Sequence, residues 1–276
     1  MGLGGFFDYS KPGPGINKNA PEKHTFVVFF ETWFRNVWRL LPSGCIYVLL
    51  NLFLIPSGLG SAGLTNIARN MARDKHSFGF SDFIDTIKRN WKQSLVAGIL
   101  NVVVTTLVVI SGWLYYFNTK GWMGTIGASL MITAFFVLSV MKYYVWLLII
   151  TFKMSLKNIL KNAFYFVFIG LKKNLIIGIC SILWYAVSVG ICLLIPYDIV
   201  LVIVLALNLC FFPGFKHLLI QFCIFPVVKK VMIDPYYEEH PDDDVEIRRN
   251  LGLVDDEEDV ESVFNDKQLI PEDKDR

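Results

Sequence analysis

Charged residues are scarce in this sequence, and their scarcity argues against an ordinary soluble globular protein. Of the 276 residues only 18% are Asp, Glu, Lys or Arg, whereas 54% are hydrophobic. Soluble domains carry about 25% charged residues. The apolar residues are gathered in long runs that are nearly free of charge, and about 20 such residues cross a bilayer as one helix. The sequence therefore predicts an all-α, polytopic membrane protein.

The sequence also lacks the motifs of common catalytic chemistry. It contains no HExxH, GxSxG or GxxxxGK[ST] pattern. Its four histidines, His24, His76, His217 and His240, do not have metal-ligand spacing. The apolar runs hold no acidic residue apart from Asp198 at the end of one run. We therefore expect no enzyme, no metal and no cofactor, and nothing in the sequence points to nucleic acid.

Cysteine usage indicates neither a disulfide framework nor a zinc site. The number of cysteines is odd, all of them lie in apolar runs, and none forms a CxxC pair. We interpret them as small apolar side chains inside helices. These residues are Cys45, Cys180, Cys192, Cys210 and Cys223.

Hydropathy predicts a transmembrane bundle of about five spans. The expected spans are residues 43–55 (with a start as early as 37), 95–117, 124–152, 175–195 and 199–228. The first is short, Pro56 closes it, and a run of small residues follows. It could cross the membrane, or it could re-enter as a hairpin whose second helix begins near Leu59.

Amphipathic segments with many aromatic and basic residues precede several of these spans. Residues 24–41 are expected to lie in the membrane interface, unless they form the solvent-exposed end of the first span. Residues 78–92 and 153–173 are expected to form two interfacial elbow helices. Within the first we also expect Asp85 to pair with Arg89 at i,i+4. The elbow residues are Phe80, Phe83, Ile87, Trp91, Lys88, Arg89, Lys172 and Lys173.

The charge distribution divides the chain into three parts. We expect a leader and interfacial helix over residues 1–36, a transmembrane domain over 37–233 and an acidic tail over 234–276. From Asp234 onward the sequence holds 17 acidic and 5 basic residues, whereas the preceding part is strongly basic. Such a tail is expected to be largely disordered. It could serve only for solubility, or it could dock on a basic partner or on the chain's own basic elbows.

Lysine and arginine counts predict the orientation, because basic residues concentrate on the cytoplasmic side. With five full spans, thirteen basic residues share the side of the C-terminus and six lie opposite. With a re-entrant first segment, the counts become 18 and 1. Either topology predicts a multi-pass protein with a cytoplasmic C-terminus, whereas the side of the N-terminus stays open.

Residues 58–63 spell GxGxxG, a pattern known from dinucleotide-binding loops. Such a loop follows a β-strand in a βαβ unit, whereas this one follows an apolar helix, so nucleotide binding is not expected. Small residues at this spacing favour close helix packing. An unwound segment that lines a cavity is the alternative interpretation.

The polar residues inside the predicted spans include Lys142, Asn208, Lys216 and His217. A charge in the hydrocarbon layer is costly unless it is paired or reaches an interface. Lys142 could therefore extend to the headgroups, and Asn208 could form hydrogen bonds between helices. If the helix ends near Pro213, Lys216 and His217 could lie at the surface. Alternatively, the four residues could line a polar path for a small solute, beside Pro213 and Gly214, which would kink the last span.

The first hundred residues carry a family resemblance. Its segments are residues 6–15, 35–40, 51–52, 55–56, 69–73, 80–83 and 88–94. In order and spacing they resemble the YesL family (DUF624) of bacterial membrane proteins. The sequence departs from the family at Arg73-Asp74-Lys75, where members often have Gly-Glu or Gly-Asp after a basic pair. The later spans match in length and hydropathy only.

The resemblance implies a non-enzymatic accessory or regulatory role in the bacterial cytoplasmic membrane. Family members tend to accompany carbohydrate ABC importers and their sensor systems, so we expect transporter subunits or a membrane sensor kinase as partners, beside the lipid bilayer. No ligand-binding or catalytic residue follows from the resemblance. The alternative hypothesis is a small-solute transporter with a polar path near Lys142 and Lys216.

Overall fold

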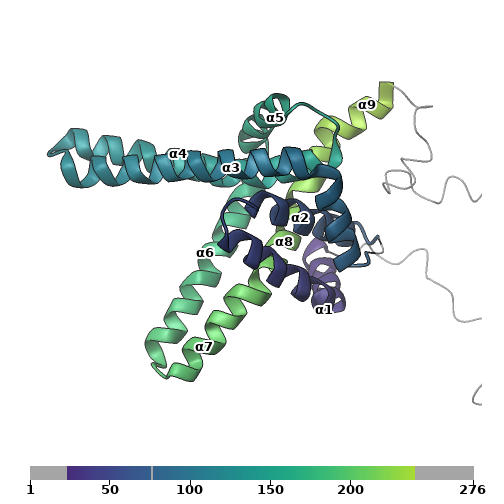
Figure 1. Ribbon diagram of the computed structural model, residues 1–276, viewed down its shortest axis with the longest axis horizontal. Coiled ribbons are helices and arrows are strands. Elements are labelled where there is room, and N and C mark those ends of the chain that lie inside the picture. The colour runs from purple at the N-terminus through teal and green to yellow at the C-terminus, as the bar shows by residue number, and fades with distance from the viewer. Residues whose placement is uncertain (1–23, 76, 240–276) are drawn as a thin grey trace, which may run out of the picture.

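The computed structural model describes residues 24–75 and 77–239, and every regular element within them is helical. The predicted all-α class is confirmed. The helices are α1 (Thr25–Leu52), α2 (Ser57–Ala72), α3 (Phe80–Asn118), α4 (Trp122–Thr151), α5 (Leu156–Ile169), α6 (Leu171–Leu194), α7 (Asp198–Ala206), η2 (Leu207–Phe211), α8 (Phe212–Val228), η3 (Lys229–Ile233) and α9 (Asp234–Glu239). Figure 1 shows a body of packed helices from which two long arms extend.

Four helical segments of the described chain are long and apolar enough to cross a membrane. They are α3, α4, α6 and the continuous helical stretch from Asp198 to Glu238, which comprises α7 to α9. The apolar windows of these segments correspond to four of the five expected spans. The first expected span, residues 43–55, lies in α1 and the turn that follows, and α1 is not among the four.

The α1 and α2 helices form an antiparallel hairpin. The chain reverses over Phe53–Pro56, where Leu54 adopts a positive φ of 56°. Arg35 near the start of α1 forms an ion pair with Asp74 just after α2, which shows that the two helices run in opposite directions. The structure therefore shows a helical hairpin in this region.

The expected interfacial helix and the first span are parts of one helix, so the predicted boundary between residues 36 and 37 falls inside α1. The aromatic residues of its first half pack against the protein. Phe29 and Trp33 are 5% and 3% exposed. Both rings meet Phe215 of α8 edge to face, at centroid distances of 5.4 and 5.2 Å.

The four apolar segments form two separate hairpins instead of the expected single bundle. One arm consists of α3 and α4, joined by a turn in which Gly121 has a φ of 78°. The other consists of α6 and α7, joined over Ile195–Tyr197. Figure 1 shows the two arms diverging from the body. Only 11% of the apolar window of α3 and 11% of that of α6 is buried within the chain.

The cores lie in the body, where two clusters of buried side chains share α8. One cluster joins α1, α2 and α3 to α8 and includes Leu40, Leu64 and Phe83. The other joins α4, α5 and α6 to α8 and includes Tyr144 and Ile224. Because α8 belongs to both clusters, it fixes the first half of the chain against the second.

The glycines of the GxGxxG motif lie in α2 and permit close helix packing, as one of the two interpretations predicted. An ideal Cβ at Gly58 would lie 2.0 Å from the carbonyl oxygen of Ser94 in α3, and one at Gly63 would lie 2.7 Å from the Phe83 ring. Since the segment is helical, it is not an unwound loop.

Pro213 does not end the last apolar helix. The backbone widens into the π-helical turn η2 immediately before it and continues through α8. Proline lacks the N–H donor of a regular helix and clashes with the preceding turn, which is the turn that widens here.

The two expected elbows differ in the structure. Residues 80–92 belong to the same helix, α3, as the span that follows. The second elbow contains a separate helix, α5, which ends at Gly170 before α6 begins. Of the predicted acidic tail, residues 234–239 form α9, and residues 240–276 lie outside the described residues, as do residues 1–23 of the leader.

Candidate functional site

Lys142 and Lys216 meet where α4 approaches α8. The Lys216 ammonium lies 5.8 Å from the centroid of the Tyr143 ring, and it is close enough to Lys142 for the two charges to repel. The structure thus brings together two of the four residues of the predicted polar path.

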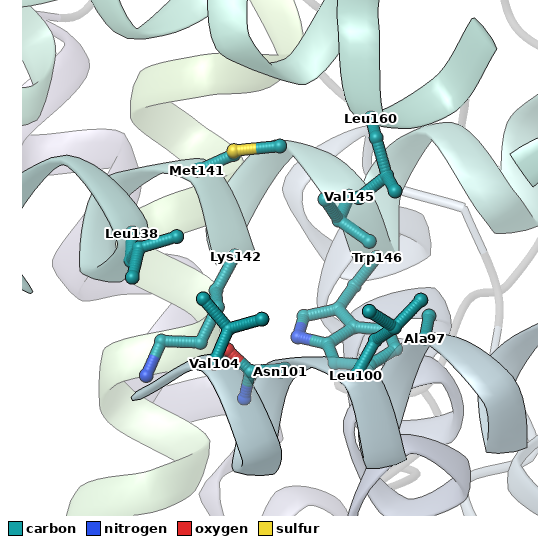
Figure 2. A pocket seen from close by; sticks show the side chains of 10 residues that line it. All are labelled: Ala97, Leu100, Asn101, Val104, Leu138, Met141, Lys142, Val145, Trp146 and Leu160. Atoms are coloured by element: carbon teal, nitrogen blue, oxygen red, sulfur yellow. The ribbon is translucent and has the colours of Figure 1, made fainter. Parts of the chain in front are cut away.

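A cavity of about 190 Å³ lies beside Lys142, between α3 and α4. Figure 2 shows Lys142 of α4 and Asn101 of α3 extending toward the same side of this cavity. The other lining residues are apolar apart from the Trp146 indole: Ala97, Leu100, Val104, Leu138, Met141, Val145 and Leu160. The cavity therefore offers one cation and one amide on a mainly apolar wall.

Asn208 lies in the other arm, where it links α6 to the last helix. Its Oδ1 accepts a hydrogen bond of 3.0 Å from the Trp184 indole. Its Nδ2 donates to Ser188 Oγ at 3.2 Å and to the Val204 carbonyl oxygen at 2.8 Å. These bonds match the alternative prediction of interhelical hydrogen bonding.

His217 points into the body and has its own partners. Its ring lies 4.9 Å from that of Tyr47 in α1, edge to face. Its Nδ1 lies 2.9 Å from the Pro213 carbonyl oxygen. Since a carbonyl can only accept, Nδ1 carries the proton in this contact. Asn208 thus has separate surroundings from the lysine pair, whereas His217 lies close enough to Lys216 for the two charges to repel when both are protonated.

The elbow residues divide between buried and exposed positions. Phe83 is fully buried and Ile87 is half-buried, both in the core cluster with α1 and α2. Phe80 and Trp91 are exposed at 57% and 50%. The four cations Lys88, Arg89, Lys172 and Lys173 are all exposed, and no ion pair joins Arg89 to Asp85 among the described residues.

Two arginines at the end of α2 form a site that the sequence did not predict. Arg69 is only 8% exposed. Its guanidinium donates to Thr151 Oγ1 at 2.9 Å, to Asn66 Oδ1 at 2.8 Å and to the Ile150 carbonyl oxygen at 3.4 Å. All three acceptors are neutral, so the charge of this buried group has no counterion among them.

Arg73 follows one turn later and lies 5.0 Å from the centroid of the Phe225 ring in α8. Burial and repulsion from Arg73 lower the pKa of Arg69 to about 10, and burial lowers the pKa of Arg73 to about 10. Both groups therefore remain charged at neutral pH. No carboxylate forms an ion pair with either of them in the part of the chain that the structure describes.

Several polar atoms of this region meet no hydrogen-bond partner in the described structure. They include Nε of Arg69, Nε and Nη2 of Arg73, and both amide atoms of Gln221, a side chain that is 1% exposed. Gln221 lies one helical turn before Phe225, on the face of α8 that Arg73 contacts. Buried polar atoms are nearly always satisfied in native proteins, so this group calls for a physical explanation.

A larger cavity, about 650 Å³ in volume, opens next to Arg69, and we call it the basic pocket. Arg69 reaches its wall through Thr151 and Ile150. The lining residues come from α3, from the end of α4 and from the linker to α5: Arg89, Asn90, Gln93, Ile149, Ile150, Thr151, Phe152, Lys153, Met154 and Ser155. No carboxylate is among these lining residues.

One sequence signal could have identified the arginine site. Arg69 and Arg73 are spaced i,i+4 in an apolar segment, so they share one face of a helix that is rich in buried small residues. The role of Thr151, by contrast, depends on tertiary packing between α2 and α4.

The arrangement can hold an anion, because cations and neutral polar side chains line one cavity. It holds no paired carboxylates and no nucleophile with an adjacent base. Comparisons with protein-family models, with curated proteins and with solved structures give no match for this chain.

Proposed function

We propose that this chain is a non-enzymatic accessory protein of the bacterial cytoplasmic membrane, which binds another membrane protein through its two apolar arms. On the resemblance to the YesL family, the proposed partners are the membrane subunits of a carbohydrate ABC importer or an associated sensor kinase. The observation that carries the proposal is the divergence of the arms (Figure 1).

Divergent hairpins fit lateral binding better than transport. A secondary transporter binds its solute near the membrane midplane, between helices that enclose the site. Here most side chains of the arms face outward, as Ile132 of α4 and Ile182 of α6 do at 70% and 69% exposure. Lipid or the helices of a partner would cover these faces.

The positions of the basic residues support an orientation with the body on the cytoplasmic side. Among the basic residues of the described body are Arg35, Arg69, Arg89, Lys153 and Lys173, whereas Lys120 lies at the tip of the first arm. The positive-inside tendency then directs both arm tips outward. In this orientation the α1–α2 hairpin stays on the cytoplasmic side, together with α9.

The depth of the two lysines favours contact with headgroups over a solute path. Lys142 lies 20 residues after the start of α4 and Lys216 lies 18 residues after the start of α7. At 1.5 Å per residue these separations are about 30 and 27 Å. The hydrocarbon core is about 30 Å thick, so both ammonium groups would reach the cytoplasmic interface.

The small-solute transporter remains the second candidate, because Lys142 lines a cavity and Lys216 lies near Lys142. It predicts solute flux in proteoliposomes that Lys142→Leu and Lys216→Leu abolish. The accessory role predicts no flux from the unaltered chain. Sustained uptake of a solute by the purified protein would favour the transporter.

Photo-crosslinking in living cells tests the accessory role. A photoreactive amino acid replaces Ile132 or Ile182 on the arms, with Phe26 of α1 as an equally exposed control at 72%. We expect the arm positions to capture an importer subunit or sensor kinase that mass spectrometry identifies, and the control position not to capture it. Arm positions that capture only lipid would contradict the proposal.

A further inference from the structure

The basic pocket carries positive charge without a matching anion. Arg89 and Lys153 line it, both are exposed, and neither forms an ion pair within the described residues. Asn90, Gln93, Thr151 and Ser155 add neutral polar groups. Two cations that line one cavity together attract an anion into it.

The start of α5 adds further positive potential. Ser155 is the N-cap residue of this 14-residue helix, yet its side chain makes no capping hydrogen bond, and the first turn contains no acidic residue. The first backbone N–H groups of a helix lack intrahelical acceptors, and they favour an anion together with the helix dipole. Because Ser155 lines the pocket, this helix end opens toward the same space.

Arg69 provides the second, independent observation. It is more than nine-tenths buried, its Nε has no partner, and its Nη1 donates to Thr151 on the pocket wall. A buried guanidinium without a carboxylate is expensive to maintain for stability alone. Its charge beneath Thr151 strengthens the attraction for an anion in the pocket.

The shape of the pocket is also fixed by hydrogen bonds. The Gln93 side chain donates to the Met154 carbonyl oxygen at 2.8 Å, which holds the linker between α4 and α5 against α3. The volume of about 650 Å³ lies within the range of small-molecule sites, roughly 300–1,000 Å³. The pocket can therefore admit a phosphate together with a small attached group.

We infer that the basic pocket binds a phosphate-bearing anion between Arg89, Lys153 and the start of α5. Arginine and lysine are the usual phosphate-binding side chains. The anion could be the headgroup of an acidic phospholipid or a soluble phosphate. Thr151 lies nine residues after Lys142, or about 14 Å further along α4, so the proposed insertion places it on the cytoplasmic side of the hydrocarbon core. This depth rests on the proposed insertion of the arms, whereas the chemistry of the pocket does not.

The test uses the purified full-length chain and its thermal unfolding midpoint, followed by the fluorescence of its seven tryptophans. The first experiment compares nanodiscs of phosphatidylcholine with nanodiscs that also contain phosphatidylglycerol. The second experiment titrates inorganic phosphate into the chain in neutral detergent, which requires no membrane insertion. The variant is R89Q/K153Q, and the matched control K88Q/K161Q removes two exposed cations that do not line the pocket.

We expect a saturable rise in the unfolding midpoint in at least one of the two experiments. The experiment that shows the rise identifies the source of the phosphate. In R89Q/K153Q the apparent affinity should fall about tenfold or more, because each lost charge-assisted bond has a large effect. K88Q/K161Q should keep the response. No rise of the midpoint in either experiment, or an equal loss of the rise in both double variants, would overturn the inference.

Ser155→Asp provides a second variant that does not depend on removing cations. Aspartate is a favoured N-cap residue and suits the helix dipole, so the variant should fold at least as stably as the unaltered chain. Its carboxylate would also occupy the start of α5 and repel phosphate. We expect a raised midpoint without phosphate and little further rise with it. A full phosphate response in this variant would contradict the assignment.

Discussion

The missing side chain of Gly58 sets the distance between α2 and α3. A Cβ there would lie 2.0 Å from the Ser94 carbonyl oxygen, and one on Gly98 would lie 2.7 Å from the Gly58 nitrogen. These contacts involve backbone atoms, which cannot move aside as the end of a flexible side chain can. Glycine is therefore required here for packing, although the segment has the spacing of a nucleotide-binding loop.

Replacement of Gly58 by alanine should destabilise the body. Overpacking of this kind costs about 1–3 kcal/mol, so we expect a clear fall in the thermal unfolding midpoint in detergent. Gly178→Ala in α6 is the matched control, because no atom lies within 4 Å of its added Cβ. An equal midpoint for the two variants would show that α2 and α3 are not packed this closely.

Replacement of Gln221 should have the opposite effect and raise the unfolding midpoint. Both of its polar atoms are buried without a partner in the described structure, and such a group costs about 1–3 kcal/mol. Gln221→Met keeps a similar length and removes the polar atoms, so its unfolding midpoint should rise. A lower midpoint would mean that the amide has a polar partner, such as a water molecule or a ligand, in the native protein.

At the level of elements, Asn208 holds the α6–α7 arm together. It joins Trp184 and Ser188 of α6 to the last apolar helix. Interhelical hydrogen bonds in membranes contribute about 0.6–2 kcal/mol. The arm has few buried contacts within the chain, so these bonds have a large share in its stability.

Asn208→Ala should therefore loosen this arm. We expect faster hydrogen exchange of the α6 and η2 backbone amides, measured by mass spectrometry, with the α3–α4 arm unchanged. Asn101→Ala is the control, because Asn101 accepts only a 3.4 Å hydrogen bond from Thr105 of its own helix, α3. Equal exchange in α6 for both variants would argue against an interhelical role for Asn208.

The sequence predicted most helical elements because hydropathy, proline and glycine act locally. The turn before Trp122 and the end of α6 before Pro196 follow from such signals. The reversal after α1 remained open, because a short apolar run followed by Pro56 suits both a span and a hairpin. The arginine site could not be derived, since Arg69 meets Thr151 across 82 residues of sequence. The divergence of the arms could not be predicted from local sequence either. The outward faces of helices are apolar both in a single bundle and in separate hairpins.

For the whole molecule, the proposed insertion predicts which residues are reachable from outside the cell. In a chain without its native cysteines, Lys120→Cys at the tip of the first arm should react with a membrane-impermeant maleimide added to intact cells. Lys75→Cys and Lys153→Cys in the body should react only after the membrane is opened. Labelling of Lys75→Cys in intact cells would place the end of the α1–α2 hairpin outside and contradict the orientation.

The proposed binding of a partner depends most on two arms that stand apart, because this geometry exposes their faces. Packed helices lie 8–10 Å apart, so the tips of a compact four-helix bundle would lie within about 20 Å of each other. The most direct measurement is the distance between spin labels at Thr119→Cys and Tyr197→Cys in nanodiscs, obtained by pulsed electron paramagnetic resonance. The account predicts a distribution centred well beyond about 20 Å. A single narrow distribution below that distance would show a closed bundle and contradict it.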